Sequence, residues 1–372
     1  MKSLLKIPLL VAVATMMTCS FSACSDNDDP TPDTGTSETD AKFEAIAKQY
    51  LDHTVYVTYK NLADETEQLV KDLQALKSSK TDANVKATCE TFLEARAWWE
   101  KSEAFLYGAA TDFGIDPHID SWPLDLDGLQ TALKNTEQVE AMGGEDGDIY
   151  AGEKLGNSLL GFHGIEYILF EESVSKISDL HLTYAVAVAG DLRNRCWQLE
   201  LSWRGESAVN ADRVAKVANE LELPYTVNSG EYSYGENMLN AGKAGSTYAS
   251  WTLAMQAIID GCKTIADEVG TSKIGKPYSG EDPAYIESPY SHKSILDFYD
   301  NIISIQNAYM GGIENERDET NSLHNYIAGV DKELDTKVVN AINNALTKIN
   351  AMAAPFVNNI KDPSAGEAMK AC

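Results

Sequence analysis

Basic residues are scarce in this chain of 372 residues, which has 30 lysines and arginines against 57 aspartates and glutamates and a formal net charge of −27 at pH 7. Nucleic-acid binding needs clustered positive charge to neutralise phosphates, so the sequence predicts no nucleic-acid partner. Beyond the N-terminal segment, no apolar run reaches the roughly 20 residues of a membrane-spanning helix. With 11 prolines and 44% hydrophobic residues, the remainder is typical of a folded globular protein.

Alternating strand and helix patterns are also missing after residue 40, which argues against a Rossmann fold or an α/β barrel. Apolar residues instead recur every three or four positions, the period of an amphipathic helix. A first long segment starts near residue 41 and continues to about 76. The other predicted helical segments cover residues 82–108, 126–135, 153–172, 177–204, 244–269, 291–311, 318–330 and 332–352.

The helical pattern breaks between two sets of segments, where Pro224 and the run Asn228-Ser229-Gly230 interrupt it, and a second irregular stretch follows at Gly275 to Pro289. We therefore predict an all-α fold with a first helical bundle at 41–210, a connecting loop or short hairpin at 211–243 and a second bundle at 244–372. Residues 102–108 and 305–311 end long helical segments in a similar way, which favours two related bundles from an internal duplication. Chance similarity between amphipathic helices is the alternative.

The N-terminus resembles a bacterial lipoprotein signal. Lys2 and Lys6 precede an apolar run, and the segment Phe21-Ser22-Ala23 ends before Cys24. We predict a signal peptide at 1–23, lipidation of Cys24 and an acidic flexible tether at 24–40. The mature protein would be lipid-anchored in the cell envelope, at the outer membrane, on the periplasmic or the surface face. An ordinary secretory signal is the alternative.

Four further cysteines follow the predicted lipidation site. Cys89, Cys196 and Cys262 lie on apolar helical stripes, and Cys372 ends the chain. They are expected to act as small buried hydrophobic residues, because their spacing suggests no compact disulfide framework. An oxidising compartment would still permit one disulfide pair.

A histidine and a glutamate stand three residues apart within an apolar helical segment. On a helix His163 and Glu166 share one face, so imidazole and carboxylate can close on one ion. A carboxylate in apolar surroundings persists only when it is paired, hydrogen-bonded or metal-bound. Gly161 and Gly164 each cost about 1 kcal/mol in a helix and therefore suggest a close approach there. A purely structural His–Glu hydrogen bond is the alternative.

These residues form the motif GxHxxE, read here as Gly161-Phe162-His163-Gly164-Ile165-Glu166, which resembles the signature of the imelysin or M75 peptidase family. Further resemblance lies in residues 95–108, 119–123, 307–311 and 322–323. The family implies an all-helical fold of two related bundles, an envelope location and a link to bacterial iron uptake.

The resemblance also implies metal binding through His163 and Glu166 with acidic helpers, which fall on Glu103 and Asp120 of this chain. Some relatives have an acidic cluster where this chain has Ser121-Trp122-Pro123-Leu124, and there only Asp125 offers a substitute. The mixed oxygen and imidazole ligands suit iron or zinc.

Three functions follow as alternatives. The first is binding of a metal ion or a small iron-related ligand for uptake. The second is an M75-type metallopeptidase, although no HExxH motif is present and a zinc site would need a distant histidine, namely His181, His292 or His324. The third is a surface scaffold for a peptide or an envelope protein partner. The sequence favours the binding protein and leaves enzymatic activity undecided.

Overall fold

The computed structural model describes residues 37–171 and 176–372, and every regular element in these ranges is a helix. The predicted all-α class is therefore confirmed. The predicted signal peptide, the lipidation site Cys24 and most of the tether lie outside the described residues. Within the described ranges, no helix combines the length and the apolar character required to cross a membrane.

Seven helices of 13 or more residues carry most of the core. They are α1 (Glu38–Tyr50), α2 (Tyr56–Ser78), α3 (Asp82–Glu100), α10 (Asp179–Arg204), α13 (Trp251–Glu268), α15 (Ser294–Met310) and α17 (Lys332–Asn350). The shorter α-helices are α4 (Ala109–Asp112), α5 (Asp116–Ile119), α6 (Leu126–Lys134), α7 (Thr136–Ala141), α8 (Gly147–Lys154), α9 (Gly161–Glu166), α11 (Ala211–Val214), α12 (Tyr234–Leu239), α14 (Gly275–Ser279), α16 (Leu323–Val330), α18 (Phe356–Asn359) and α19 (Pro363–Ala371).

Short turns of other helical types join these elements. Wider π-helical turns are Leu51–Val55, Tyr167–Glu171, Ala215–Glu220 and Val269–Ile274. Tighter 3₁₀ turns are Glu103–Phe105, Asn157–Leu159, Glu206–Ala208, Val227–Ser229 and Glu319–Asn321.

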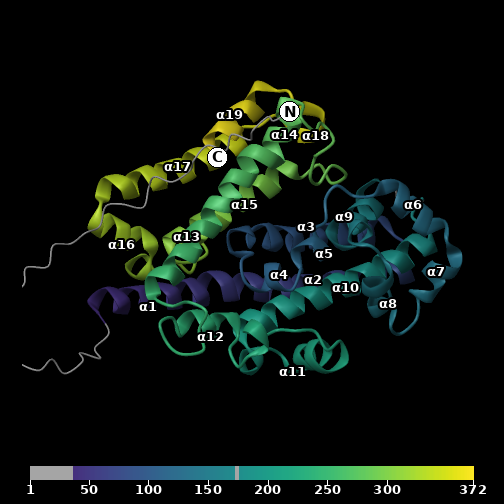
Figure 1. The fold of residues 1–372 in the computed structure, drawn as a ribbon. Helices are drawn as coiled ribbons and strands as arrows, with labels where there is room; N and C mark the ends of the chain where they lie inside the picture. The colour runs from purple at the N-terminus through teal and green to yellow at the C-terminus, as the bar shows by residue number, and fades with distance from the viewer. Residues whose placement is uncertain (1–36, 172–175) are drawn as a thin grey trace, which may run out of the picture. The chain divides into compact units, whose positions relative to one another are not determined.

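One group of helices forms around α2, which packs against both α3 and α10. The apolar period of α2 explains this packing, because Leu62, Leu69 and Leu73 all lie on its buried face. Helices α4 to α9 connect α3 to α10 along the chain, and α6 to α9 lie at the blue and teal end of the molecule in Figure 1. The four described cysteines are unbonded, and Cys196 is fully buried in this group.

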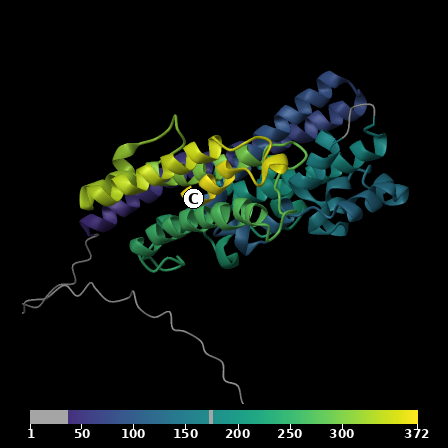
Figure 2. The same cartoon turned by 90° about the horizontal axis from the view of Figure 1, so that it is seen from above.

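A second group contains the helices from α13 onward, in which α15 packs against both α13 and α17. Helix α1 joins this group although it precedes α2 in the chain, because it contacts α13 and Phe43 stacks edge-on against Tyr326 at 4.9 Å. Figure 2 shows the green and yellow helices of this group gathered around the purple α1. Residues 38–372 nevertheless form one compact unit.

The segment 211–243, expected as a loop or hairpin, contains α11 and α12 and no strand. Helix α12 forms there because Ser233 and Glu236 make a reciprocal capping box at its start. Two other predicted helices are shorter than expected: α3 ends at Glu100 and is followed by the 3₁₀ turn Glu103–Phe105, and 153–172 is broken before Gly161. The first break lies near the packing of α15 against α3, and the second lies near the packing of α9 against α5.

Candidate metal site

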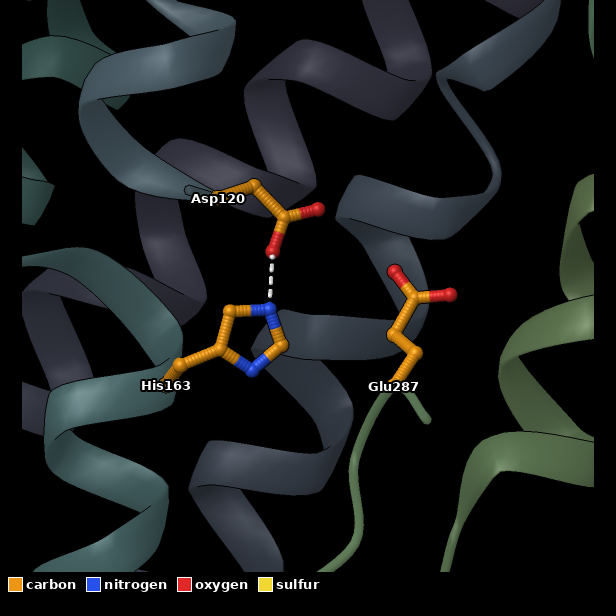
Figure 3. Close-up of side chains that lie close together, drawn as sticks. All are labelled: Asp120, His163 and Glu287. Atoms are coloured by element: carbon orange, nitrogen blue, oxygen red, sulfur yellow. Dashed lines mark ion pairs between the residues drawn. The ribbon is translucent and has the colours of Figure 1, made fainter. Parts of the chain in front are cut away.

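His163 owes its position to a glycine at the start of α9. Gly161 has a φ of +66°, and a Cβ there would lie 1.9 Å from the backbone carbonyl oxygen of Ile119. Only glycine allows this conformation and this approach without strain. Helix α9 is therefore pressed against the end of α5, and His163 Nε2 lies 3.0 Å from Oδ1 of Asp120 (Figure 3).

Asp120 is held from three sides. Its Oδ2 accepts a hydrogen bond of 2.7 Å from the indole Nε1 of Trp99, and its Oδ1 forms an ion pair with Arg96 in addition to the contact with His163. The side chains of Asp120 and Arg96 are 6% and 2% exposed. Burial alone would raise the pKa of Asp120, but Arg96 and His163 outweigh it and hold this pKa well below its usual range.

Glu166 lies at the opposite nitrogen of the same imidazole. Its Oε2 is 3.5 Å from His163 Nδ1, and its Oε1 accepts hydrogen bonds from the backbone N–H and the hydroxyl of Ser291 at 2.8 and 2.7 Å. Both His163 and Glu166 are 1% exposed, as their apolar neighbours in the sequence suggest. Burial would lower the pKa of His163, but its contacts with Asp120 and Glu166 raise it to about 9.

Glu287, from the second group of helices, contributes a further carboxylate beside Asp120 and His163. Glu287 belongs to the irregular chain between α14 and α15, and its side chain reaches toward Asp120 and His163 (Figure 3). One ligand atom from each of Asp120, His163 and Glu287 lies within 4.8 Å of the other two. Oε1 of Glu287 pairs with Arg96 at 2.8 Å, whereas its buried Oε2 accepts no hydrogen bond from any described group.

A second group of carboxylates shares Asp120 with the first. Ligand oxygens of Glu100, Glu103 and Asp120 also lie within 4.8 Å of one another. We refer to Glu100, Glu103, Asp120 and Glu287 together as the carboxylate cluster. Among the described residues, these are the two groups in which three or more His, Cys, Asp or Glu side chains bring ligand atoms within 4.8 Å of one another.

Carboxylates outnumber permanent cations in and around the cluster. Burial raises the pKa of Glu100 to about 7 despite Arg96 and Lys273, and it raises the pKa of Glu103 well above its usual range. Burial and the neighbouring Asp120 likewise raise the pKa of Asp116 to about 7. Burial therefore favours the protonated form of these carboxyl groups more than the nearby cations favour the charged form.

An acidic cavity of about 250 Å³ leads to the carboxylate cluster. We define it by its charged lining, which consists of Glu103, Asp116, Asp120, Glu268, Glu287 and a single cation, Lys273. Walls of one sign attract ions of the opposite sign and raise their local concentration. The cavity is therefore suited to a cation and unfavourable for an anionic ligand.

Three of the four residues expected from the sequence to bind a metal belong to the ligand groups. Asp120 and His163 belong to the ligand group with Glu287, and Asp120 also belongs to the ligand group with Glu100 and Glu103. Glu166 contacts His163 but belongs to neither ligand group. Asp125 belongs to neither ligand group. It instead caps α6, because its Oδ1 accepts a hydrogen bond of 2.9 Å from the backbone N–H of Gly128. The groups also include none of the distant histidines His181, His292 and His324.

Sequence reasoning missed Arg96, Glu100, Lys273 and Glu287. A usable signal existed for the first two, because Arg96 and Glu100 are one turn apart on the helix face that also carries Phe92 and Trp99, all of them buried. Two opposite charges on an apolar face indicate a buried ion pair, and theirs is present at 2.5 Å. Lys273 and Glu287 lie in the second half of the chain and have no such local signal.

Comparisons with known proteins agree with this fold. A solved structure of an iron-regulated protein A precursor from Parabacteroides distasonis is 25% identical, with a TM-score of 0.74 and coverage of 91% of this chain and 93% of that one. An imelysin-like protein from Psychrobacter arcticum, at 12% identity, has a TM-score of 0.62 with coverage of 89% and 91% and supports the fold alone.

A curated relative, iron-regulated protein A of Synechococcus elongatus, is 29% identical over 263 residues. This match covers 70% of the chain and 63% of the relative, which is less than two thirds of the relative's length. Residues 55–372 match the family described as imelysin, peptidase M75, and this range contains the GxHxxE motif with its buried histidine and glutamate. The chain therefore belongs to the imelysin family.

Proposed function

We propose that this protein binds a multivalent metal ion at Asp120, His163 and Glu287, and that iron is the ion it serves. The observation that carries the proposal is the buried Glu287 Oε2, which accepts no hydrogen bond from the described residues and belongs to a group with an imidazole nitrogen and a second carboxylate. A buried carboxylate oxygen is costly unless it is paired or coordinates a metal.

The donor set fits such an ion. Ligand atoms that each lie about 2.1 Å from one ion are at most about 4.2 Å apart, so the group needs a movement of less than about 1 Å to close. One imidazole with two carboxylates suits iron, manganese or zinc. The names of the Synechococcus and Parabacteroides proteins refer to regulation by iron, which makes iron the first ion to test.

The other residues receive supporting roles in this proposal. Glu166, fixed by Ser291, orients the imidazole through Nδ1 so that Nε2 faces the ion, as carboxylates commonly do behind metal-bound histidines. Glu103 lines the acidic cavity through which the ion enters. Lipidation of Cys24 would hold the protein at the envelope membrane, where it would meet incoming metal.

Calorimetric titration of chelator-stripped protein with Fe²⁺ under anaerobic conditions, and with Zn²⁺, tests the proposal. We expect one ion per chain for the wild type and at least about tenfold weaker binding for His163→Ala and Glu287→Gln, because each variant loses a ligand. Asp267→Asn removes the same charge as Glu287→Gln from an exposed position on α13, so it serves as the matched control and should bind normally. Equal binding by all four proteins, or by none, would refute the proposed site.

A further inference from the structure

Lys273 places its ammonium group among the cluster carboxylates. Its side chain is 6% exposed, and Nζ lies 3.3 Å from Glu287 Oε1, 3.5 Å from Glu103 Oε1 and 3.7 Å from Glu100 Oε2. The residue belongs to the π-helical turn Val269–Ile274, which follows α13 directly. Such turns change the direction of side chains relative to a regular helix and are frequent at functional sites.

The ammonium touches members of both ligand groups. Glu287 belongs to the group with His163, and Glu100 and Glu103 belong to the group without it, while Asp120 is shared. A metal ion at either group would therefore share carboxylates with Lys273 Nζ, namely that of Glu287 in the group with His163 and those of Glu100 and Glu103 in the other. The two positive charges would repel each other.

Arg96 differs from Lys273 in two respects. It forms ion pairs with Glu100 at 2.5 Å and with Glu287 at 2.8 Å, which are shorter than any of the three contacts of Lys273, and it does not line the acidic cavity. Lys273 lines the cavity and holds its three partners at 3.3 Å or more. Of these two buried cations, Lys273 is thus the one that an incoming ion can reach and displace.

Resting on the function proposed above, we propose that Lys273 is a tethered cation that excludes monovalent ions from the carboxylate cluster and lets it load only with multivalent ions. A potassium or sodium ion brings the same charge as the ammonium group and gains nothing in exchange. The ammonium also has a high effective concentration, because it is part of the chain. A divalent or trivalent ion gains additional Coulomb energy from the same carboxylates and can displace it.

The test measures Mn²⁺ binding to chelator-stripped, full-length protein in potassium chloride and in tetramethylammonium chloride at the same ionic strength. For the wild type we expect equal affinity in the two salts. Lys273→Met should bind Mn²⁺ about tenfold or more tightly than the wild type in tetramethylammonium, because the competing charge is gone. Potassium should then weaken its binding severalfold. Lys273→Gln retains a polar side chain and provides a second neutral variant if the methionine variant does not fold.

Lys276→Met is the matched control. It removes the same charge three residues away, where Lys276 Nζ lies 4.5 Å from the ring centroid of Tyr285 rather than among the cluster carboxylates. This variant should behave like the wild type in both salts. The same tightening in Lys276→Met as in Lys273→Met would mean that net charge alone is responsible, and it would overturn the inference.

The remaining outcomes separate this inference from the proposed function. If the wild type binds Mn²⁺ and the folded Lys273 variants bind equally well or more weakly, the inference fails and the metal site stands. If wild-type binding is weaker in potassium than in tetramethylammonium, Lys273 does not exclude monovalent ions and the inference also fails. Binding by the variants without binding by the wild type refutes both, because Lys273 would then exclude Mn²⁺ as well as monovalent ions. Absence of binding by every protein overturns both.

Discussion

Replacement of Asp120 by asparagine is the most direct test of the electrostatics at His163. In the wild type the imidazole lies between Asp120, 3.0 Å from Nε2, and Glu166, 3.5 Å from Nδ1, and its pKa is raised to about 9. Asparagine keeps the shape of the side chain and removes the charge. Because burial by itself lowers the pKa of a histidine, the pKa of His163 should fall by at least about one unit in Asp120→Asn.

The size of the effect follows from the raised pKa. A rise from 6.5 to about 9 corresponds to about 3 kcal/mol of preference for the protonated ring in the folded state. A group whose pKa is raised on folding contributes stability that is fully present below its unfolded pKa. This contribution should therefore be complete below pH 6.5 and be lost as the pH rises through about 9. In Asp120→Asn most of this pH dependence should disappear.

The assay is a titration of the histidine ring signals by NMR between about pH 5 and pH 10, a range that spans both pKa values. The signal of His163 is assigned as the one missing in His163→Gln. Asp191→Asn is the matched control, because Asp191 pairs with another histidine, His118, at 2.7 Å, and that pair is separate from His163 and the carboxylate cluster. A wild-type midpoint for His163 at or below 6.5, or the same midpoint in Asp120→Asn, would refute the reasoning.

Three further predictions concern the surroundings of the site. Gly161→Ala should lower the free energy of unfolding by at least about 2 kcal/mol in denaturant titrations, because its Cβ would lie 1.9 Å from the carbonyl oxygen of Ile119 at a φ of +66°; a loss below about 0.5 kcal/mol would contradict this. Ser291→Ala removes one of two hydrogen bonds to Glu166 and should cost about 1 to 2 kcal/mol in the same measurement, so unchanged stability would argue against the contact. Cys24→Ser should move the protein from the membrane to the soluble fraction and abolish acyl mass, whereas unchanged partitioning would exclude lipid anchoring.

Helical periodicity was sufficient to predict the fold class, because each helix carries its own apolar face. The burial of His163 and Glu166 was predictable for the same reason, since their neighbours Phe162 and Ile165 are apolar and fully buried. The interruption before Gly161 was not predicted. A helical pattern of side chains continues through residues 153–172, and the break arises from the tertiary approach of α9 to Ile119.

The partners of the site were harder to predict than its centre. Glu287 stands 121 residues after Glu166 in a stretch rich in proline and glycine, and nothing in its immediate sequence distinguishes it from a solvated loop glutamate. It reaches the site because α15 packs against α3, and because Ser294 at the start of α15 donates a hydrogen bond to the Glu287 carbonyl oxygen. Contacts of this kind depend on the assembled fold, which local periodicity does not encode.

Because the carboxylate cluster carries excess negative charge, its stability should depend on whether a metal ion is bound. A buried ion network is weak evidence for stability, because desolvation offsets much of the attraction between its members. Here the carboxylates exceed Arg96 and Lys273, and burial raises the pKa of Glu100 and of Glu103, which favours protonation as compensation for part of the difference. A multivalent ion can replace those protons and the charge of Lys273 at once. Loading would therefore release protons from these carboxyl groups and from the imidazole of His163, whose pKa is raised to about 9 without metal. The affinity for the ion should therefore rise with pH through this range, because each of these groups must be deprotonated before it can bind the ion.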